Sequence, residues 1–397
     1  MLGNLLKGLH ILDLTQNVAG PFCTQILGDF GADVIKVERL GRGDDTRSWL
    51  PPEIEGQSAT FLALNRSKKS ICVNLDSEDG INLIRKLALT ADVVIHSMKP
   101  GSAESRGLGP EQLRELNPRL IYCAISAFGE TGPLSHLPGY DPLMQAFTGI
   151  MAVTGNSEDD PVRVSVSLID MGTGMWAALG IFAAVMSRQQ TGQGMLVNAS
   201  LLETGMSWMT IFIASYLASG QLPEKLGSAM SMAAPYQLFP SRDGHVFIAA
   251  GNDELFAKVC RALECFELLD DPRFKYNFDR VKNRQSLVEA ISNYTRQRNT
   301  QDLVHDLRAA GAPCSELNTI AQALNHEQVR ALGIVDDVDD SNIRGLKAVG
   351  LPLRINGQRA GRISPPPMLA ADTDAVLAAF GINEDERLML RNAGAIA

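Results

Sequence analysis

Asp170 is the residue of this sequence best placed for covalent chemistry. It ends the run VRVSVSLID (162–170), whose alternating apolar residues predict a strand, and a helix is expected to begin near Gly172. The positive end of that helix dipole would favour an ionised carboxylate, which is the form that acts as a nucleophile. The same position suits an ordinary helix N-cap, and position alone favours the N-cap.

Basic side chains gather where three predicted strands end. Because the carboxyl ends of parallel strands meet along one edge of a sheet, such loops predict a site for an anionic cofactor with several phosphates. Solvated surface charge is the alternative, and the residues alone favour neither. The three groups are Lys36, Arg39, Arg42 and Arg47; Arg66, Lys68 and Lys69; and Lys99 with Arg106.

The segment GTGMWA (172–177) matches the GxGxxA pattern of dinucleotide-binding folds. Such a site needs an acidic residue about 20 positions further on, but the next predicted strand, MLVNAS (195–200), ends in Ser200. We therefore favour close helix–sheet packing and expect no NAD.

The six histidines lack metal-binding spacing, and neither a Cys/His cluster nor a GxSxG or P-loop motif occurs, so we expect no metal.

The elements that must position these residues alternate between strand and helix. Strands rich in Val and Ile, separated by amphipathic helices, indicate a parallel sheet covered on both faces. The sequence thus predicts a doubly wound, Rossmann-like α/β domain. The predicted strands are HILDLT (10–15), ADVIKVE (32–38), KSICVNL (69–75), ADVVIHS, LIYCAIS (120–126) and MLVNAS, with helices over AGPFCTQILGDFG (19–31), from Ser77, from about Gly172, and a further long helix after MLVNAS that ends at Ala218.

The character of the chain changes after Gly220. A hairpin-like segment, PYQLFPSRDGHVFIAAG (235–251), turns at Asp243-Gly244, and charge-rich helical segments follow. These patterns predict a second, smaller α+β domain. The expected bounds are 1–219 for the large Rossmann-like domain, completed by about 350–397, then 225–325 for the small domain and 326–350 for a return linker.

Composition narrows the class of protein. The 397 residues are 45% apolar and carry a net charge of −9, which disfavours nucleic acid as a partner. The N-terminus lacks the features of a signal peptide, and the apolar run 176–186 is shorter than the about 20 residues that span a bilayer. Six cysteines form no CxxC pair. We expect a reduced, cytoplasmic protein that does not enter a membrane.

Several motifs, in order along nearly the whole chain, resemble the family III CoA-transferases, the group of formyl-CoA transferase and carnitine CoA-transferase. They include ILDLTQNVAGPFCTQILGDFGADVIKVERLGRGDDTR, LNRSKKSICVNL, SAFGETGP, GYDPLMQAFTG, LIDMGTGMWAALGI, TGQGMLVNASLLE and PYQLFPSRDGHVFIAAGND. The resemblance implies that CoA and acyl-CoA are substrates, and that two chains interlock as rings in a homodimer with a large and a small domain.

The resemblance also implies roles for single residues. Asp170 falls on the family's catalytic aspartate, which forms first an anhydride and then an aspartyl-CoA thioester. This match reverses the preference for an N-cap at Asp170. Tyr140 matches an active-site tyrosine. The cofactor-binding positions implied in the same way are Val18, Arg39, Lys68, Ser97, Met98 and Arg106.

Departures from the family pattern bear on the substrate. Val18 replaces a glutamine of formyl-CoA transferase, and Gly227-Ser-Ala-Met-Ser-Met stands in place of a glycine-rich flap. The second-domain motif looks more like members that use succinyl-CoA and small dicarboxylates, so we expect succinyl-CoA as donor and itaconate, mesaconate, citramalate or glutarate as acceptor. Three alternatives are an α-methylacyl-CoA racemase or epimerase, whose histidine would stand at Tyr140, a non-catalytic CoA-binding protein and, least favoured, a dehydrogenase.

Overall fold

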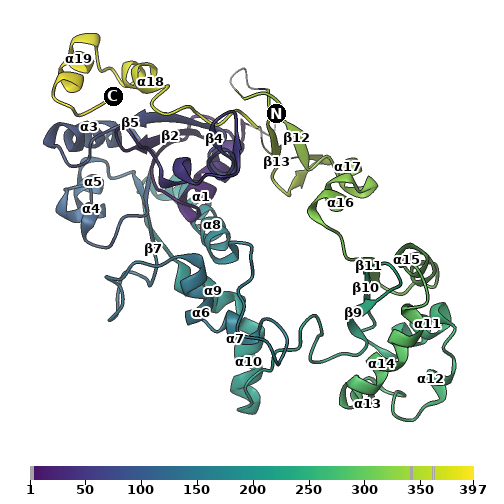
Figure 1. The fold of residues 1–397 in the computed structure, drawn as a ribbon. Helices are drawn as coiled ribbons and strands as arrows, with labels where there is room; N and C mark the ends of the chain where they lie inside the picture. Colours follow the sequence, from purple (N-terminus) through teal and green to yellow (C-terminus); the bar gives the residue numbers. More distant parts are fainter. Residues whose placement is uncertain (1–3, 340–342, 360, 362) are drawn as a thin grey trace. The chain divides into compact units, whose positions relative to one another are not determined.

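The computed structural model describes residues 4–339, 343–359, 361 and 363–397. The chain divides into two compact units, each with its own hydrophobic core (Figure 1). The larger unit comprises Met1–Ile150, Arg163–Gly220 and Leu332–Ala397, and the smaller comprises Met151–Val162 and Gln221–Ala331.

The larger unit is built on a parallel sheet of six strands in the order β5-β2-β1-β6-β7-β8. Numbered along the chain, this order reads 3-2-1-4-5-6, which is the strand order of Rossmann folds. The prediction of an α/β fold with a central parallel sheet is therefore confirmed. The strands are β1 (His10–Leu14), β2 (Asp33–Glu38), β5 (Lys68–Cys72), β6 (Val93–His96), β7 (Ile121–Ser126) and β8 (Leu196–Ser200).

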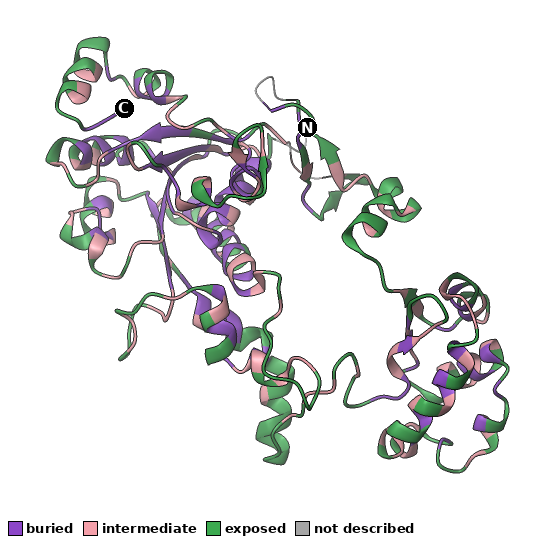
Figure 2. Ribbon diagram, in the orientation of Figure 1, coloured by how far each residue is buried: buried purple, intermediate pink, exposed green. Residues whose placement is uncertain are grey.

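Helices cover both faces of this sheet, which explains why its strands are apolar on both sides (Figure 2). On one face, Leu12 and Leu14 of β1 join a core with α3 (Glu78–Ala88), α5 (Pro110–Leu116) and α18 (Thr373–Ala379). On the other face, α1 (Ala19–Asp29) packs along α8 (Leu168–Thr191). Ser77 caps α3 by accepting a hydrogen bond from the Gly80 N–H, as the sequence predicted.

The predicted apolar run 176–186 is part of the much longer helix α8, which Gly192 ends in the left-handed conformation with a φ of 72°. Within the described residues, α8 is the one helix that is long and apolar enough to cross a membrane by length and composition. It packs against α1, β7, β8 and α9 (Leu201–Trp208). The expected long helix up to Ala218 is interrupted at Met209, after which α10 (Thr210–Ser219) begins.

Shorter elements complete the larger unit. They are η2 (Asp45–Ser48), β3 (Glu53–Ile54), β4 (Gln57–Ser58), α2 (Ala59–Leu64), α4 (Ser102–Ser105), α6 (Asp141–Phe147), β12 (Val335–Asp337), β13 (Lys347–Val349), β14 (Arg354–Ile355), β15 (Gln358–Arg359) and α19 (Glu384–Asn392), while α7 (Ile150–Val153) and α17 (Glu327–Leu332) lie at the unit boundaries.

The smaller unit contains the predicted hairpin. β9 (Tyr236–Pro240) and β10 (His245–Ala249) pair antiparallel on either side of Asp243-Gly244, and β11 (Cys314–Glu316) adds a third strand. Phe239, Val246 and Ile248 are fully buried in its core. The helices of this unit are α11 (Asp253–Leu263), α12 (Glu267–Asp270), α13 (Asn277–Lys282), α14 (Arg284–Thr295), α15 (Thr300–Ala309) and α16 (Ile320–Asn325).

Candidate active site

A cavity of about 230 Å³ opens where the strand order of the parallel sheet reverses. Residues 16–20, which follow β1, and residues 97–100, which follow β6, line it together with Asp170. β1 and β6 are the neighbouring strands whose crossover connections run in opposite directions. In open α/β sheets this switch point is where ligands bind, so the topology places Asp170 at the expected ligand site.

The local structure around Asp170 differs from the prediction. Residues 162–167 form no strand, and α8 already begins at Leu168, so Asp170 lies in the first turn of the helix. Alternation alone was misleading, because Val162 and Val166 are 44% and 61% exposed and face no core. Asp170 is thus neither the end of a strand nor an N-cap.

Asp141, at the start of α6, accepts the hydrogen bonds of backbone N–H groups in the first turn of α8 instead. Its Oδ2 atom accepts hydrogen bonds from the backbone N–H groups of Ile169 (2.7 Å) and Asp170 (3.1 Å). Its other oxygen accepts one from the Gln145 side chain, and Asp141 is buried. Asp-Pro before an apolar run signals a helix start, but nothing in the sequence shows that this carboxylate reaches a second helix.

The Asp170 carboxyl has a strongly perturbed pKa. Burial, and after it the nearby charge of Asp141, raises the pKa of Asp170 to about 7. Within the described ranges, no group donates a hydrogen bond to its carboxylate oxygens. The raised pKa is the opposite of the shift that we expected from the helix dipole. A carboxyl with a pKa near neutrality in a cavity is typical of functional sites.

Four other predicted site residues lie with Asp170 around the cavity: Val18, Ser97, Met98 and Tyr140. Ser97 Oγ accepts a hydrogen bond from the Gln16 N–H (3.1 Å), which ties the two strand-end loops together. Tyr140 directly precedes α6 and is 59% exposed. The cavity therefore brings together residues that are more than 150 positions apart in the sequence.

Two predicted cofactor-binding arginines lie outside the cavity lining. Arg39 donates to the Gly43 carbonyl oxygen and pairs with Asp45, while Arg106 donates to the Leu75 carbonyl oxygen and pairs with Asp76. Their side chains are 30% and 33% exposed, so part of each guanidinium faces solvent.

Lys68 does not lie in a loop after a strand, as predicted, but is the first residue of β5. Its side chain is fully buried, and its ammonium group donates to Asp13 Oδ2 (3.1 Å), the Asn65 side chain (2.8 Å) and the Pro21 carbonyl oxygen (2.9 Å). Three acceptors use all three ammonium protons. Lys36 is likewise buried, within β2, where its ammonium group pairs with Asp44 at 2.7 Å.

The glycines of GTGMWA allow helices to approach closely. A Cβ atom on Gly174 would lie 2.4 Å from the Ala19 carbonyl oxygen of α1, and one on Gly172 would lie 2.6 Å from Trp208 of α9. The packing interpretation therefore holds, but the partners are helices rather than the sheet. Trp49 also lines the cavity, and no sequence signal pointed to it.

Among the residues for which the structure is described, no three His, Cys, Asp or Glu side chains come together as metal ligands.

The family model described as CoA-transferase family III matches residues 6–373. This chain belongs to CoA-transferase family III. The resemblance inferred from the motifs is confirmed, and the protein is an enzyme of the CoA-transferase class.

Named members of CoA-transferase family III resemble the chain over most of its length. Succinyl-CoA:glutarate CoA-transferase of Mus musculus is 38% identical over 94% of this chain and 85% of its own. Succinyl-CoA–D-citramalate CoA-transferase of Chloroflexus aurantiacus is 32% identical over 97% and 96%. A crystal structure of a CAIB/BAIF family protein from Brucella suis superposes with a TM-score of 0.86 at 37% identity, covering 94% of this chain and 99% of that one.

Proposed function

We propose that this enzyme moves CoA from succinyl-CoA to a small dicarboxylic acid through a covalent intermediate on Asp170. The observation that carries the proposal is the Asp170 carboxyl itself, which lines the switch-point cavity with a pKa of about 7. The substrates are suggested by the relatives, several of which are named for succinyl-CoA and a dicarboxylate.

In the proposed mechanism, the ionised Asp170 attacks the thioester carbonyl of the donor. The C–S bond breaks, CoA thiolate leaves, and an aspartyl–acyl mixed anhydride remains. The thiolate then attacks the aspartyl carbonyl, which releases the donor acid and leaves an aspartyl-CoA thioester. The acceptor carboxylate repeats these two steps in reverse and regenerates Asp170. Each step exchanges one acyl bond for another, as in other covalent catalysis.

The cavity walls fit the demands of this chemistry. The first residues of α1, Ala19 and Gly20, line the cavity, and backbone N–H groups at a helix N-terminus stabilise developing negative charge. We propose that Tyr140 contacts the reacting acyl group, that Val18, Ser97 and Met98 shape the thioester site, and that Arg39 and Arg106 bind CoA phosphates. Lys68 is not among the proposed CoA-binding residues, because its ammonium group already donates three hydrogen bonds within the protein interior.

The test of this proposal is mass spectrometry of the peptide that contains Asp170 after incubation with succinyl-CoA and hydroxylamine. Hydroxylamine should convert an activated aspartyl group to a hydroxamate, and the buried Asp141 serves as an internal control that stays unmodified. The same enzyme is then offered succinate, glutarate, citramalate, mesaconate and itaconate, with formate and oxalate as comparison acids. Absence of the hydroxamate, together with deuterium entry at the α-carbon of a branched acyl-CoA, would favour the racemase.

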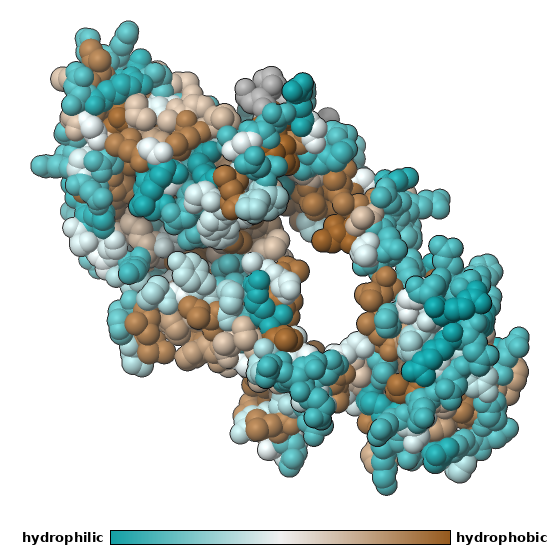
Figure 3. All heavy atoms as spheres, viewed as in Figure 1, coloured by the Kyte–Doolittle hydropathy of each residue, from teal (hydrophilic) through white to brown (hydrophobic). Residues whose placement is uncertain are grey.

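We also propose that the enzyme is a homodimer. The helix α10 is strongly apolar, yet none of its residues is buried, and Ile211 and Leu217 are 70% and 76% exposed (Figure 2). Apolar side chains also gather over α6 and α9 in Figure 3. Exposed apolar patches of this kind mark protein interfaces. An interlocked arrangement, with 326–350 as the return linker, follows from the family resemblance.

Light scattering should give a molar mass of about twice the 42.9 kDa of one chain. Leu217→Asp should shift the protein toward the monomer, because it places a charge in an apolar contact. Ser215→Asp, on the same helix, should leave the mass unchanged if Ser215 lies off the contact. A wild-type protein that is monomeric at micromolar concentration contradicts the dimer.

A further inference from the structure

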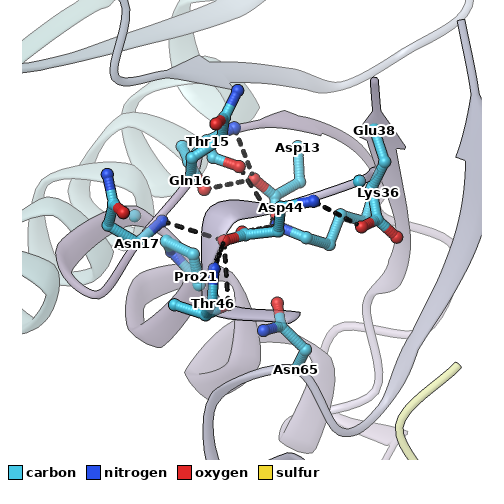
Figure 4. A network of polar contacts seen from close by, with 12 residues as sticks. Asp13, Thr15, Gln16, Asn17, Pro21, Lys36, Glu38, Asp44, Thr46 and Asn65 are labelled. Atoms are coloured by element: carbon cyan, nitrogen blue, oxygen red, sulfur yellow. Dashed lines mark hydrogen bonds and ion pairs between the residues drawn. The ribbon is translucent and has the colours of Figure 1, made fainter. Parts of the chain in front are cut away.

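A network of buried charges that the proposed mechanism does not use contacts the loop after β1 (Figure 4). Its centre is an ion pair between Lys36 of β2 and Asp44, with 2.7 Å between Nζ and Oδ2, and both side chains are fully buried. Buried ion pairs often contribute little net stability. The contribution of the Lys36–Asp44 pair is therefore better sought in the backbone groups that it holds in place.

The pair holds the loop that forms one wall of the cavity. Lys36 Nζ donates a hydrogen bond to the Thr15 carbonyl oxygen (3.0 Å), and Asp44 Oδ1 accepts one from the Asn17 N–H (3.2 Å). Asn17 has a φ of 67°, a left-handed conformation that costs a non-glycine residue energy unless its surroundings enforce it. Asn17 and the next residue, Val18, both line the cavity together with Asp170.

The same carboxylate oxygen also holds a second wall. Asp44 Oδ1 accepts hydrogen bonds from the N–H (2.9 Å) and hydroxyl (2.8 Å) of Thr46 and thereby starts the short helix η2. The Trp49 N–H donates to the Thr46 carbonyl oxygen (3.3 Å), and Trp49 lines the cavity. One side chain therefore connects the loop of residues 15–18 with the segment that carries Trp49.

Both members of the pair are charged near neutral pH. Burial opposes ionisation, but Lys36 lowers the pKa of Asp44, while Asp13 and Asp44 raise the pKa of Lys36. From these contacts, and given the proposed function of Asp170, we propose that Lys36 and Asp44 are positioning residues for CoA transfer. Their pair sets the distance of two cavity walls, at Val18 and Trp49, from the acyl group bound at Asp170.

The experiment compares Asp44→Ala and Asp44→Asn with substitutions at a matched buried pair. Asp29 pairs with Arg66 at 2.7 Å, is equally buried, and lies at the opposite end of α1 from the cavity. Asp44→Ala should lower kcat about 100-fold, with KM for succinyl-CoA changed less than about threefold, since small misplacements of reacting groups cost this much. Asp44→Asn retains an acceptor for Asn17 and Thr46, and should recover about tenfold of that loss.

Asp29→Ala should lower the melting temperature in a similar way but leave kcat of the folded enzyme within about threefold of the wild type. A kcat for Asp44→Ala that matches Asp29→Ala, or no recovery in Asp44→Asn, overturns the proposal. If Asp44→Ala does not fold, the comparison of Asp44→Asn with Asp29→Asn carries the test, with about a tenfold lower kcat expected for the former. Hydroxylamine trapping in the wild type reports on Asp170 separately, so failure of the covalent mechanism and failure of the positioning role are distinguishable.

Discussion

Replacement of Asp170 by alanine will abolish CoA transfer while CoA still binds. The substitution removes the carboxyl group that, in the proposed mechanism, forms the anhydride and the thioester, so kcat should fall on the order of 10⁴-fold or more, as for other covalent nucleophiles. The cavity walls at Val18, Ser97 and Met98 stay in place, so the dissociation constant of CoA should remain near the wild-type value. Steady-state kinetics and calorimetric titration with CoA provide the two measurements.

The variant Asp170→Asn distinguishes loss of the nucleophile from loss of the folded state. The pKa of the wild-type carboxyl is about 7 in the folded protein, well above the ordinary aspartate value of 3.8. Because this pKa is raised, ionisation costs folding free energy as the pH rises above about 4, and the full cost is reached above pH 7. The asparagine variant should therefore be inactive yet more stable at pH 8 by about 2 to 4 kcal/mol, with a smaller gain at pH 5. Transfer activity that survives in both variants contradicts the covalent mechanism.

The pH profile will show an acid limb set by Asp170. Since the nucleophile is the ionised form, kcat/KM for the donor should rise about tenfold per pH unit from pH 5 toward 7 and then level off. An acid limb centred near pH 4 would mean that burial does not control the carboxyl in solution.

Asp141→Asn should move that limb to lower pH, because it removes the second cause of the raised pKa of Asp170. Burial, the larger cause, remains, so the limb should stay above the pH range of an ordinary carboxyl. Asp160→Asn changes the net charge equally at an exposed position of the smaller unit and should leave the profile unchanged. A profile that moves equally in both variants would point to net charge rather than to Asp141.

Periodicity predicted the sheet well and the surroundings of Asp170 poorly. The Val- and Ile-rich runs of β1, β2, β6 and β7 are buried on both faces, and a local pattern suffices to recognise such strands. The run 162–167 carries a similar alternation, but it pairs with no strand, and Val162 and Val166 are exposed. A pattern of side chains does not reveal whether a neighbouring strand is available for pairing.

Charge was also misread from local sequence. Lys36 and Lys68 were placed in loops expected to bind an anionic cofactor, whereas both side chains are fully buried with acidic partners. Lys68 pairs with Asp13, which lies 55 positions away. A buried lysine is tolerated only with such a partner, and the partner is supplied by the order of the strands rather than by neighbouring residues.

The sequence by itself determined the parallel α/β architecture, the family and the candidate nucleophile, because these rest on local apolar patterns and on motifs kept in order along the chain. Only the tertiary structure decided that Asp141 begins the helix that carries Asp170, that burial raises the pKa of Asp170, and that Asp44 connects two walls of the cavity. Desolvation and hydrogen bonding act between groups that folding brings within about 3 Å of each other. Such contacts between distant residues have no counterpart in local sequence.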